Sequence, residues 1–83
     1  MIKIKLFAYL QEMVDANEIE VAFANDTPTT ADLKQAVAGA YPVVAAYLPP
    51  VRLAVDEAFV GEEAVLDITE THEYALIPPV SGG

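Results

Sequence analysis

The sequence predicts a single α+β domain in which a mixed sheet of four or five strands packs on one main helix. Apolar and polar residues alternate at the start of the chain and again after Pro50, as they do in half-buried strands. After Thr29, in contrast, apolar residues recur at helical spacing. The length of 83 residues is close to the minimum for one adequate core, so a second domain is not expected.

The first two strands are expected to form an antiparallel hairpin with a long connection. In the first strand Ile2, Ile4 and Leu6 face the core and alternate with lysines, which leaves Phe7 on the lysine face. Residues 8–14 can form a short helical turn between the strands. The second strand places Ile19, Val21 and Phe23 inward and Glu18 and Glu20 outward.

The main helix has a recognisable start and end. Thr29 and Asp32 resemble a capping box, with Thr29 as the N-cap residue, and Pro42 ends the helix at about Tyr41. Lys34 and Gln35 are expected on the outer face. The apolar positions at helical spacing are Leu33, Ala36, Val37 and Ala40.

The second half of the chain completes the sheet. Residues 51–56 alternate and predict a third strand, and residues 57–60 a short strand or bend. Leu66 and Ile68 close the core, and residues 73–77 are apolar on both faces, which indicates a central strand. The third strand is expected to place Val51, Leu53 and Val55 inward and Arg52, Ala54 and Asp56 outward.

Composition excludes several classes of function. Thirteen acidic residues against four Lys and Arg give a net charge of −9, which disfavours nucleic acid and anionic lipid and favours a basic protein surface as partner. The absence of cysteine excludes thiol nucleophiles, Cys-ligated zinc and iron–sulfur chemistry. No signal peptide and no apolar run of ~20 residues is visible, so the expected location is the cytoplasm, with no membrane partner.

The stretch Pro78-Pro79-Val80-Ser81-Gly82-Gly83 is expected to be a flexible tail on a domain formed by residues 1–77. Two glycines at a terminus usually mark a frayed end. Here they are the final two residues, and they follow two stiffening prolines and a strongly apolar strand. Six extended residues reach roughly 20 Å, enough to carry the α-carboxylate of Gly83 into a deep, narrow site on another protein.

Other polar residues do not suggest a self-contained active site. His72 is a lone histidine in a polar turn and is expected to be solvated, with no second ligand at metal-binding spacing. The acidic residues of the second half indicate a solvated face, or alternatively a surface that steers a basic partner. They are Asp56, Glu57, Glu62, Glu63, Asp67, Glu70 and Glu73.

Four stretches resemble a known family: residues 5–12 (KLFAYLQE), 30–33 (TADL), 53–56 (LAVD) and 75–83 (ALIPPVSGG). Together they are similar to the small subunit of molybdopterin synthase, a MoaD-type sulfur carrier of the β-grasp (ubiquitin-like) superfamily. A Gly-Gly end alone is shared by several groups. The apolar pair followed by Pro-Pro-Val-Ser-Gly-Gly is the specific part of the resemblance.

The resemblance implies a protein that is not an enzyme on its own. An ATP-dependent E1-like enzyme would adenylate Gly83, and sulfur would then convert it to a thiocarboxylate. The larger, catalytic subunit would bind a cyclic pterin precursor and receive the sulfur, in a heterotetrameric complex that builds the molybdenum cofactor. No metal or permanently bound cofactor is implied for this chain.

The resemblance also implies a partner interface at Phe7, Phe59 and Ile77. Phe7 and Ile77 fall on the face opposite the core by alternation, which independently favours exposure at an interface. For Phe59, capping the core edge is an equal alternative. The sequence departs from the family pattern at three places, namely Gln11, Asp56 and the turn Glu70-Thr71-His72-Glu73.

Two other functions remain open from the sequence. The first is a ubiquitin-like protein modifier that forms isopeptide bonds through Gly83. The second is a sulfur carrier of the thiazole (thiamine) type with a different acceptor. Both would use the same Gly-Gly end.

Overall fold

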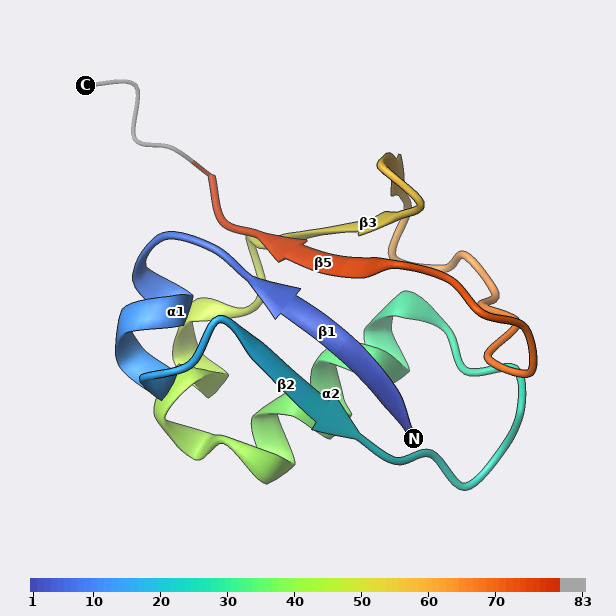
Figure 1. The fold of residues 1–83 in the computed structure, drawn as a ribbon, viewed down its shortest axis with the longest axis horizontal. Coiled ribbons are helices and arrows are strands. Elements are labelled where there is room, and N and C mark those ends of the chain that lie inside the picture. Colours follow the sequence, from blue (N-terminus) through green and yellow to red (C-terminus); the bar gives the residue numbers. More distant parts are fainter. Residues whose placement is uncertain (80–83) are drawn as a thin grey trace.

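The strands form one five-stranded sheet in the order β2-β1-β5-β3-β4 (Figure 1). The structure is a computed structural model that describes residues 1–79. Central β5 pairs in parallel with β1, and the other neighbouring strands are antiparallel. This arrangement is the β-grasp fold and confirms the predicted class. The strands are β1 (Ile2–Leu6), β2 (Glu18–Val21), β3 (Arg52–Val55), β4 (Ala58–Val60) and β5 (Tyr74–Ile77).

Helices cover one face of the sheet and leave the other open. Figure 1 shows α2 crossing behind the strands, while α1 lies at one end. The first hairpin is antiparallel as predicted, with Ile4 opposite Ile19, but β2 ends before Phe23, which is half-buried against the core. The helices are α1 (Tyr9–Val14), α2 (Thr30–Ala40) and the 3₁₀ helix η1 (Pro42–Tyr47).

The core lies between the sheet and α2. Strand residues that alternate in sequence meet Leu33 and Val37 of α2, and Leu66 closes one end as predicted. Burial of these side chains is the main stabilising term for a chain without disulfides. The fully buried apolar side chains include Ile4, Leu10, Leu33, Val37, Val44, Val51, Leu53 and Leu76.

Helix α2 begins with the predicted capping box. The Asp32 backbone N–H donates to Thr29 Oγ1 at 3.2 Å, and the Thr29 N–H donates to Asp32 Oδ2 at 2.9 Å. Each bond satisfies a donor that the first turn of a helix leaves free. At the other end the Tyr41 N–H bonds Val37 O at 2.8 Å, and Pro42 follows. Both predicted ends are therefore confirmed.

The prediction that Lys34 lies on the outer face of α2 is wrong. Only 7% of Lys34 is exposed, because residues around Pro49 and Glu62 cover the helix at that point. The Lys34 Nζ forms an ion pair with Glu62 and donates to Pro49 O at 3.3 Å. The covering loop is also held by the backbone, since the Ala31 N–H donates to Glu62 O at 3.1 Å.

We expect Glu62→Gln to destabilise the fold by about 1–3 kcal/mol, because a buried ammonium loses the carboxylate that compensates its burial. Urea unfolding at pH 7 measures the change. The matched control is Glu63→Gln, which removes the same charge from an exposed neighbour and should change stability by less than about 0.5 kcal/mol. Equal effects of the two substitutions would show that the Lys34 contact contributes nothing.

Candidate functional site

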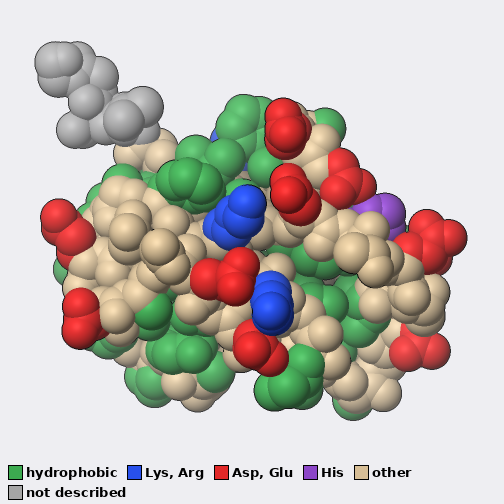
Figure 2. Space-filling view, viewed as in Figure 1, with side chains coloured by type: hydrophobic (Ala, Val, Ile, Leu, Met, Phe, Trp, Pro, Cys, Tyr) green, Lys and Arg blue, Asp and Glu red, His purple; other side chains and the backbone are tan. Residues whose placement is uncertain are grey.

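The three predicted interface residues lie together on the open face of the sheet. Phe7 is 44% exposed, Phe59 is 51% exposed, and Ile77 is half-buried. They come from three separate parts of the chain and line one depression of about 330 Å³. Figure 2 shows apolar side chains gathered on this face next to basic ones, with acidic side chains around them. Exposed apolar residues in one cluster are typical of an interaction site.

Strand register explains the depression. Ala75 of β5 pairs with Lys5 on one side and with Ala54 on the other, and Ala54 pairs with Phe59. Side chains at paired positions share one face of a sheet. The row Lys5-Ala75-Ala54-Phe59 therefore has two short side chains between two long ones. We call this depression, floored by Ala54 and Ala75, the outer-face hollow.

Ala54 shows how deep the floor lies. The sequence predicted that it faces outward, and it does line the outer-face hollow. It is nevertheless only 5% exposed, because the larger side chains around it exclude water. The predicted outward direction is confirmed, and the burial of Ala54 comes from its neighbours on the same face.

Arg52 and Ile77 form the next row of the same face, since they are paired between β3 and β5. The Arg52 guanidinium lies over the Phe59 ring, 4.1 Å from its centroid. A cation–π contact at an exposed site contributes about 0.5–1 kcal/mol. It restrains the ring that forms one wall of the outer-face hollow.

Charged residues border the hollow. Lys5 Nζ lies 3.8 Å from Glu73 Oε1, and Glu57 lines the same depression. On the side toward β2, Lys3 pairs with Glu20 and Lys5 with Glu18. These lysines thus face carboxylates across the strand pair, and the border of the outer-face hollow combines Glu57 and Glu73 with Lys5 and, over the Phe59 ring, Arg52.

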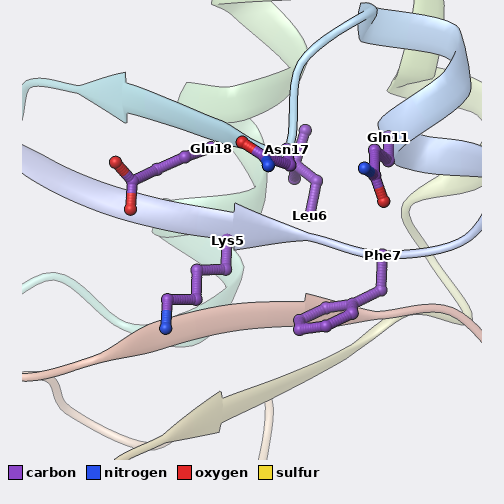
Figure 3. A pocket seen from close by; sticks show the side chains of 6 residues that line it. All are labelled: Lys5, Leu6, Phe7, Gln11, Asn17 and Glu18. Atoms are coloured by element: carbon purple, nitrogen blue, oxygen red, sulfur yellow. The ribbon is translucent and has the colours of Figure 1, made fainter.

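A neighbouring depression of about 460 Å³ lies on the other side of Phe7 (Figure 3). Figure 3 shows Lys5 and Phe7 projecting from the end of β1 over β5, while Gln11 projects from α1. Asn17 and Glu18 complete the lining. Gln11, one of the departures from the family pattern, is therefore placed next to a predicted interface residue.

The position of Phe7 depends on an unusual backbone at Ala8. Ala8 has φ 54° and ψ −133°, a conformation that a side chain with a Cβ rarely adopts. Holding a residue in such a region costs of order 1–3 kcal/mol. The turn directs the chain from β1 into α1 while Phe7 remains on the open face. Nothing in the sequence around Ala8 pointed to this strain.

The predicted tail begins at the end of β5. Ile77 ends the strand as expected, but Pro78 is buried and belongs to the body of the domain, whereas Pro79 is exposed. Strand β5 therefore carries Ile77 in the outer-face hollow and leads directly into the tail. The rest of the predicted tail lies outside the described residues, namely Val80, Ser81, Gly82 and the predicted reactive residue Gly83.

The prediction of a solvated His72 holds only in part, because the side chain is half-buried. Only 25% of its side chain is exposed, and its Nδ1 lies 2.6 Å from Asp56 Oδ2. The Glu73 backbone N–H donates to Asp56 Oδ1 at 2.9 Å, and the Asp56 N–H donates to Glu73 O at 2.8 Å. The contacts connect the β3–β4 turn to the start of β5.

The turn places Asp56 and Glu57 at φ 51° and 70°, the left-handed values that a two-residue hairpin loop requires. The pKa of Asp56 lies below its ordinary value because its carboxylate accepts the Glu73 N–H and, secondly, contacts His72. Both interactions favour the charged form. Among the described residues, no group of three or more acidic or histidine side chains could hold a metal ion.

A lowered pKa in the folded state predicts acid sensitivity. The contribution of Asp56 is present above its unfolded pKa of about 3.9 and is lost as pH falls through the lower folded value. We expect the stability difference between the parent and Asp56→Asn to shrink as pH falls from 6 to 2.5. Chemical denaturation across that range measures it, with Glu63→Gln as the control. A difference that stays constant with pH contradicts the assignment.

No helix in residues 1–79 has the length and apolar character needed to cross a membrane.

Comparison with known proteins gives two sequence matches. The model of the ThiS family matches residues 4–83. The molybdopterin synthase sulfur carrier subunit of Dictyostelium discoideum is 32% identical over 81 residues, which cover 98% of this chain and 94% of that protein.

Solved structures share the fold. SAMP1 from Haloferax volcanii superposes with a TM-score of 0.81 at 25% identity and covers 98% of this chain and 97% of its own. A putative molybdopterin converting factor subunit 1 from Pyrococcus furiosus gives a TM-score of 0.77 at 19% identity, with 94% and 95% covered. The second likeness supports the fold alone. Because the family model matches nearly the whole sequence, this chain belongs to the ThiS family.

Proposed function

We propose that this chain is the sulfur-carrier small subunit of molybdopterin synthase. The observation that carries the proposal is the 32% identity to a curated sulfur carrier subunit over nearly the full length of both chains. The family match also extends through Gly83, so it includes the Gly-Gly end. The structure adds support, because β5 joins the outer-face hollow to the tail that would carry the sulfur.

The proposed chemistry begins at the Gly83 carboxylate, which is a poor electrophile until it is activated. An E1-like enzyme transfers AMP from ATP to the carboxylate and releases pyrophosphate. A sulfide nucleophile then attacks the carbonyl carbon, the bond between that carbon and the phosphate oxygen breaks, and AMP leaves with this oxygen. A terminal glycine suits this step because no Cβ blocks the carbonyl. The product is a thiocarboxylate, which is anionic and nucleophilic at neutral pH.

Delivery requires the larger subunit. The tail enters its active site, where the thiocarboxylate sulfur attacks a carbon of the bound cyclic pterin precursor. A carbon–sulfur bond forms as a carbon–oxygen bond of the precursor breaks, so that the precursor is joined to Gly83 through a thioester. Water then cleaves the resulting thioester and restores the Gly83 carboxylate. In this scheme the small subunit supplies sulfur and position, the larger one supplies the catalytic groups, and the two form a cytoplasmic heterotetramer. Phe7, Phe59 and Ile77 contact the larger subunit.

Intact-mass measurement tests the proposal. The chain is co-expressed with a candidate E1-like enzyme and compared with the chain expressed alone. The expected result is a gain of about 16 Da at the C-terminal residue, because one oxygen is exchanged for sulfur through the acyl-adenylate. No gain with a competent activating enzyme and sulfur source would reject the sulfur-carrier function.

A second candidate, a covalent protein modifier, is favoured by one specific observation. The structure of SAMP1 from Haloferax volcanii, a small archaeal modifier protein, matches this chain at 25% identity over 98% of its length. A modifier would leave Gly83 joined to lysine side chains of other proteins. Peptide mass spectrometry distinguishes it from a carrier that only exchanges oxygen for sulfur, because lysines of other proteins would carry the C-terminal peptide of this chain, which trypsin leaves as residues 53–83.

A further inference from the structure

We propose that the outer-face hollow receives one protruding apolar side chain of the larger subunit, flanked by a basic residue of that subunit. The inference rests on the proposed function, since it names how that partner is held. The proposed contact differs from a general apolar contact because the anchor side chain must fit into the hollow. Filling the hollow therefore weakens binding of the larger subunit even when the added atoms are apolar.

The floor of the hollow is short because two alanines occupy adjacent strands. Ala75 and Ala54 are paired, and the row continues to Lys5 on one side and Phe59 on the other. Ala54 is only 5% exposed because its neighbours cover it, so the open space lies mainly above Ala75. A flat sheet face would instead carry side chains of similar length at all four positions.

The walls are long and partly fixed. Phe7 projects over β5 from one side (Figure 3), and Phe59 rises on the other, with its ring held under Arg52 at 4.1 Å. Ile77 lines the end nearest the tail. A rigid aromatic wall loses little side-chain entropy on binding, which is characteristic of pockets that hold an anchor residue.

The charged side chains at the border of the hollow favour one sign of charge in the partner residue next to the anchor. Glu57 and Glu73 line the hollow; Lys5 lies 3.8 Å from Glu73, and Arg52 lies over the Phe59 ring. Among the described residues Glu57 has no ion pair, and the chain as a whole carries a net charge of −9. A basic side chain beside the apolar anchor would pair with Glu57, whereas an acidic one would be repelled. The occupant is therefore an apolar residue with a Lys or Arg neighbour.

The test fills the hollow after the protein has folded. The chain contains no cysteine, so Ala75→Cys creates a single thiol that can be modified with methanethiosulfonates of increasing size. Each adduct is made before mixing with the larger molybdopterin synthase subunit, and titration calorimetry measures Kd. The matched control is Ala46→Cys, an exposed alanine of η1, which packs against α2 on the other side of the sheet.

We expect the methyl adduct to weaken binding a few-fold and the benzyl adduct at least tenfold. The same adducts at position 46 should leave Kd unchanged, and reduction should restore binding. Glu57→Lys should weaken binding further. Equal or tighter binding with the benzyl adduct at position 75 overturns the inference. If, in that case, the unsubstituted chain still gains about 16 Da with the activating enzyme, only the inference about the hollow fails and the sulfur-carrier function stands.

Failure of the parent chain to bind the larger subunit overturns the inference directly, because that subunit is its stated occupant. If the parent chain also shows no gain of about 16 Da with the activating enzyme, the proposed sulfur-carrier function is rejected too. A unique thiol also permits direct mapping. A photoreactive methanethiosulfonate at position 75 should cross-link to an apolar residue beside Lys or Arg in the larger subunit. Cross-links scattered over its surface contradict a single anchor.

Discussion

Removal of Gly82-Gly83, or addition of one residue after Gly83, should abolish sulfur loading while the domain remains folded. The proposed adenylation needs the α-carboxylate of a glycine, and either change removes it or buries it within an amide. Intact mass after co-expression with the E1-like enzyme should show no gain of about 16 Da. Thermal unfolding should be unchanged, because neither change touches the buried residues of the described chain, the last of which is Pro78.

The matched control is Ser81→Ala, which alters the tail but keeps its Gly-Gly end. This variant should be loaded like the parent. A truncated chain that still supported sulfur transfer in a reconstituted assay would show that the tail is not the carrier group. Loss of loading in Ser81→Ala would instead point to a side-chain requirement that the proposal does not contain.

Leu76→Ala should destabilise the domain by about 2–5 kcal/mol, which is a large part of the 5–15 kcal/mol typical of small domains. Leu76 is fully buried in the central strand and pairs with Leu6 on one side and Leu53 on the other. Truncation leaves a cavity that touches three strands. Urea unfolding at 25 °C measures the change, with circular dichroism to monitor folding.

The control for Leu76→Ala is Val65→Ala, because Val65 is 68% exposed and should change stability by less than about 0.5 kcal/mol. The two substitutions remove apolar atoms from opposite environments. A loss below 1 kcal/mol for Leu76→Ala would mean that the site collapses around the smaller side chain. It would contradict a tightly packed central strand.

Local patterns were sufficient to predict most of the fold. The alternation in residues 2–6 predicted β1 and its inward residues, and the capping box at Thr29 predicted the start of α2. The apolar character of residues 73–77 on both faces predicted that β5 is central, which the strand order confirms. These features depend on neighbours in sequence, and a single chain displays them directly.

The failures involve contacts between distant parts of the chain. Lys34 was predicted outward because lysine is seldom buried, yet a loop 28 residues later supplies its carboxylate. His72 was predicted to be solvated, but Asp56 in the β3–β4 turn contacts its ring. Helical or strand periodicity says nothing about such pairs, so neither contact could be read from spacing.

The candidate site was predicted in part. Alternation identified Phe7 and Ile77 as outward, and the resemblance added Phe59. The hollow between them was not predicted, because it depends on the register that brings Ala54 and Ala75 side by side. Small residues give no local signal of their own; they matter only when their neighbours are known.

The parallel pairing of β1 with β5 has a consequence for how the protein is made. Strand β5 lies between β1 and β3, so the sheet stays in two separate halves until residues 74–77 are inserted. Contacts across this gap join residues about 70 positions apart, and closing such long loops is a slow step in folding. A chain whose synthesis stops before Ile77 cannot close the sheet. Completion of the fold and exit of the residues after β5 from the ribosome are therefore coupled in time, and the proposed activating enzyme, if it recognises the finished sheet, would ignore incomplete chains.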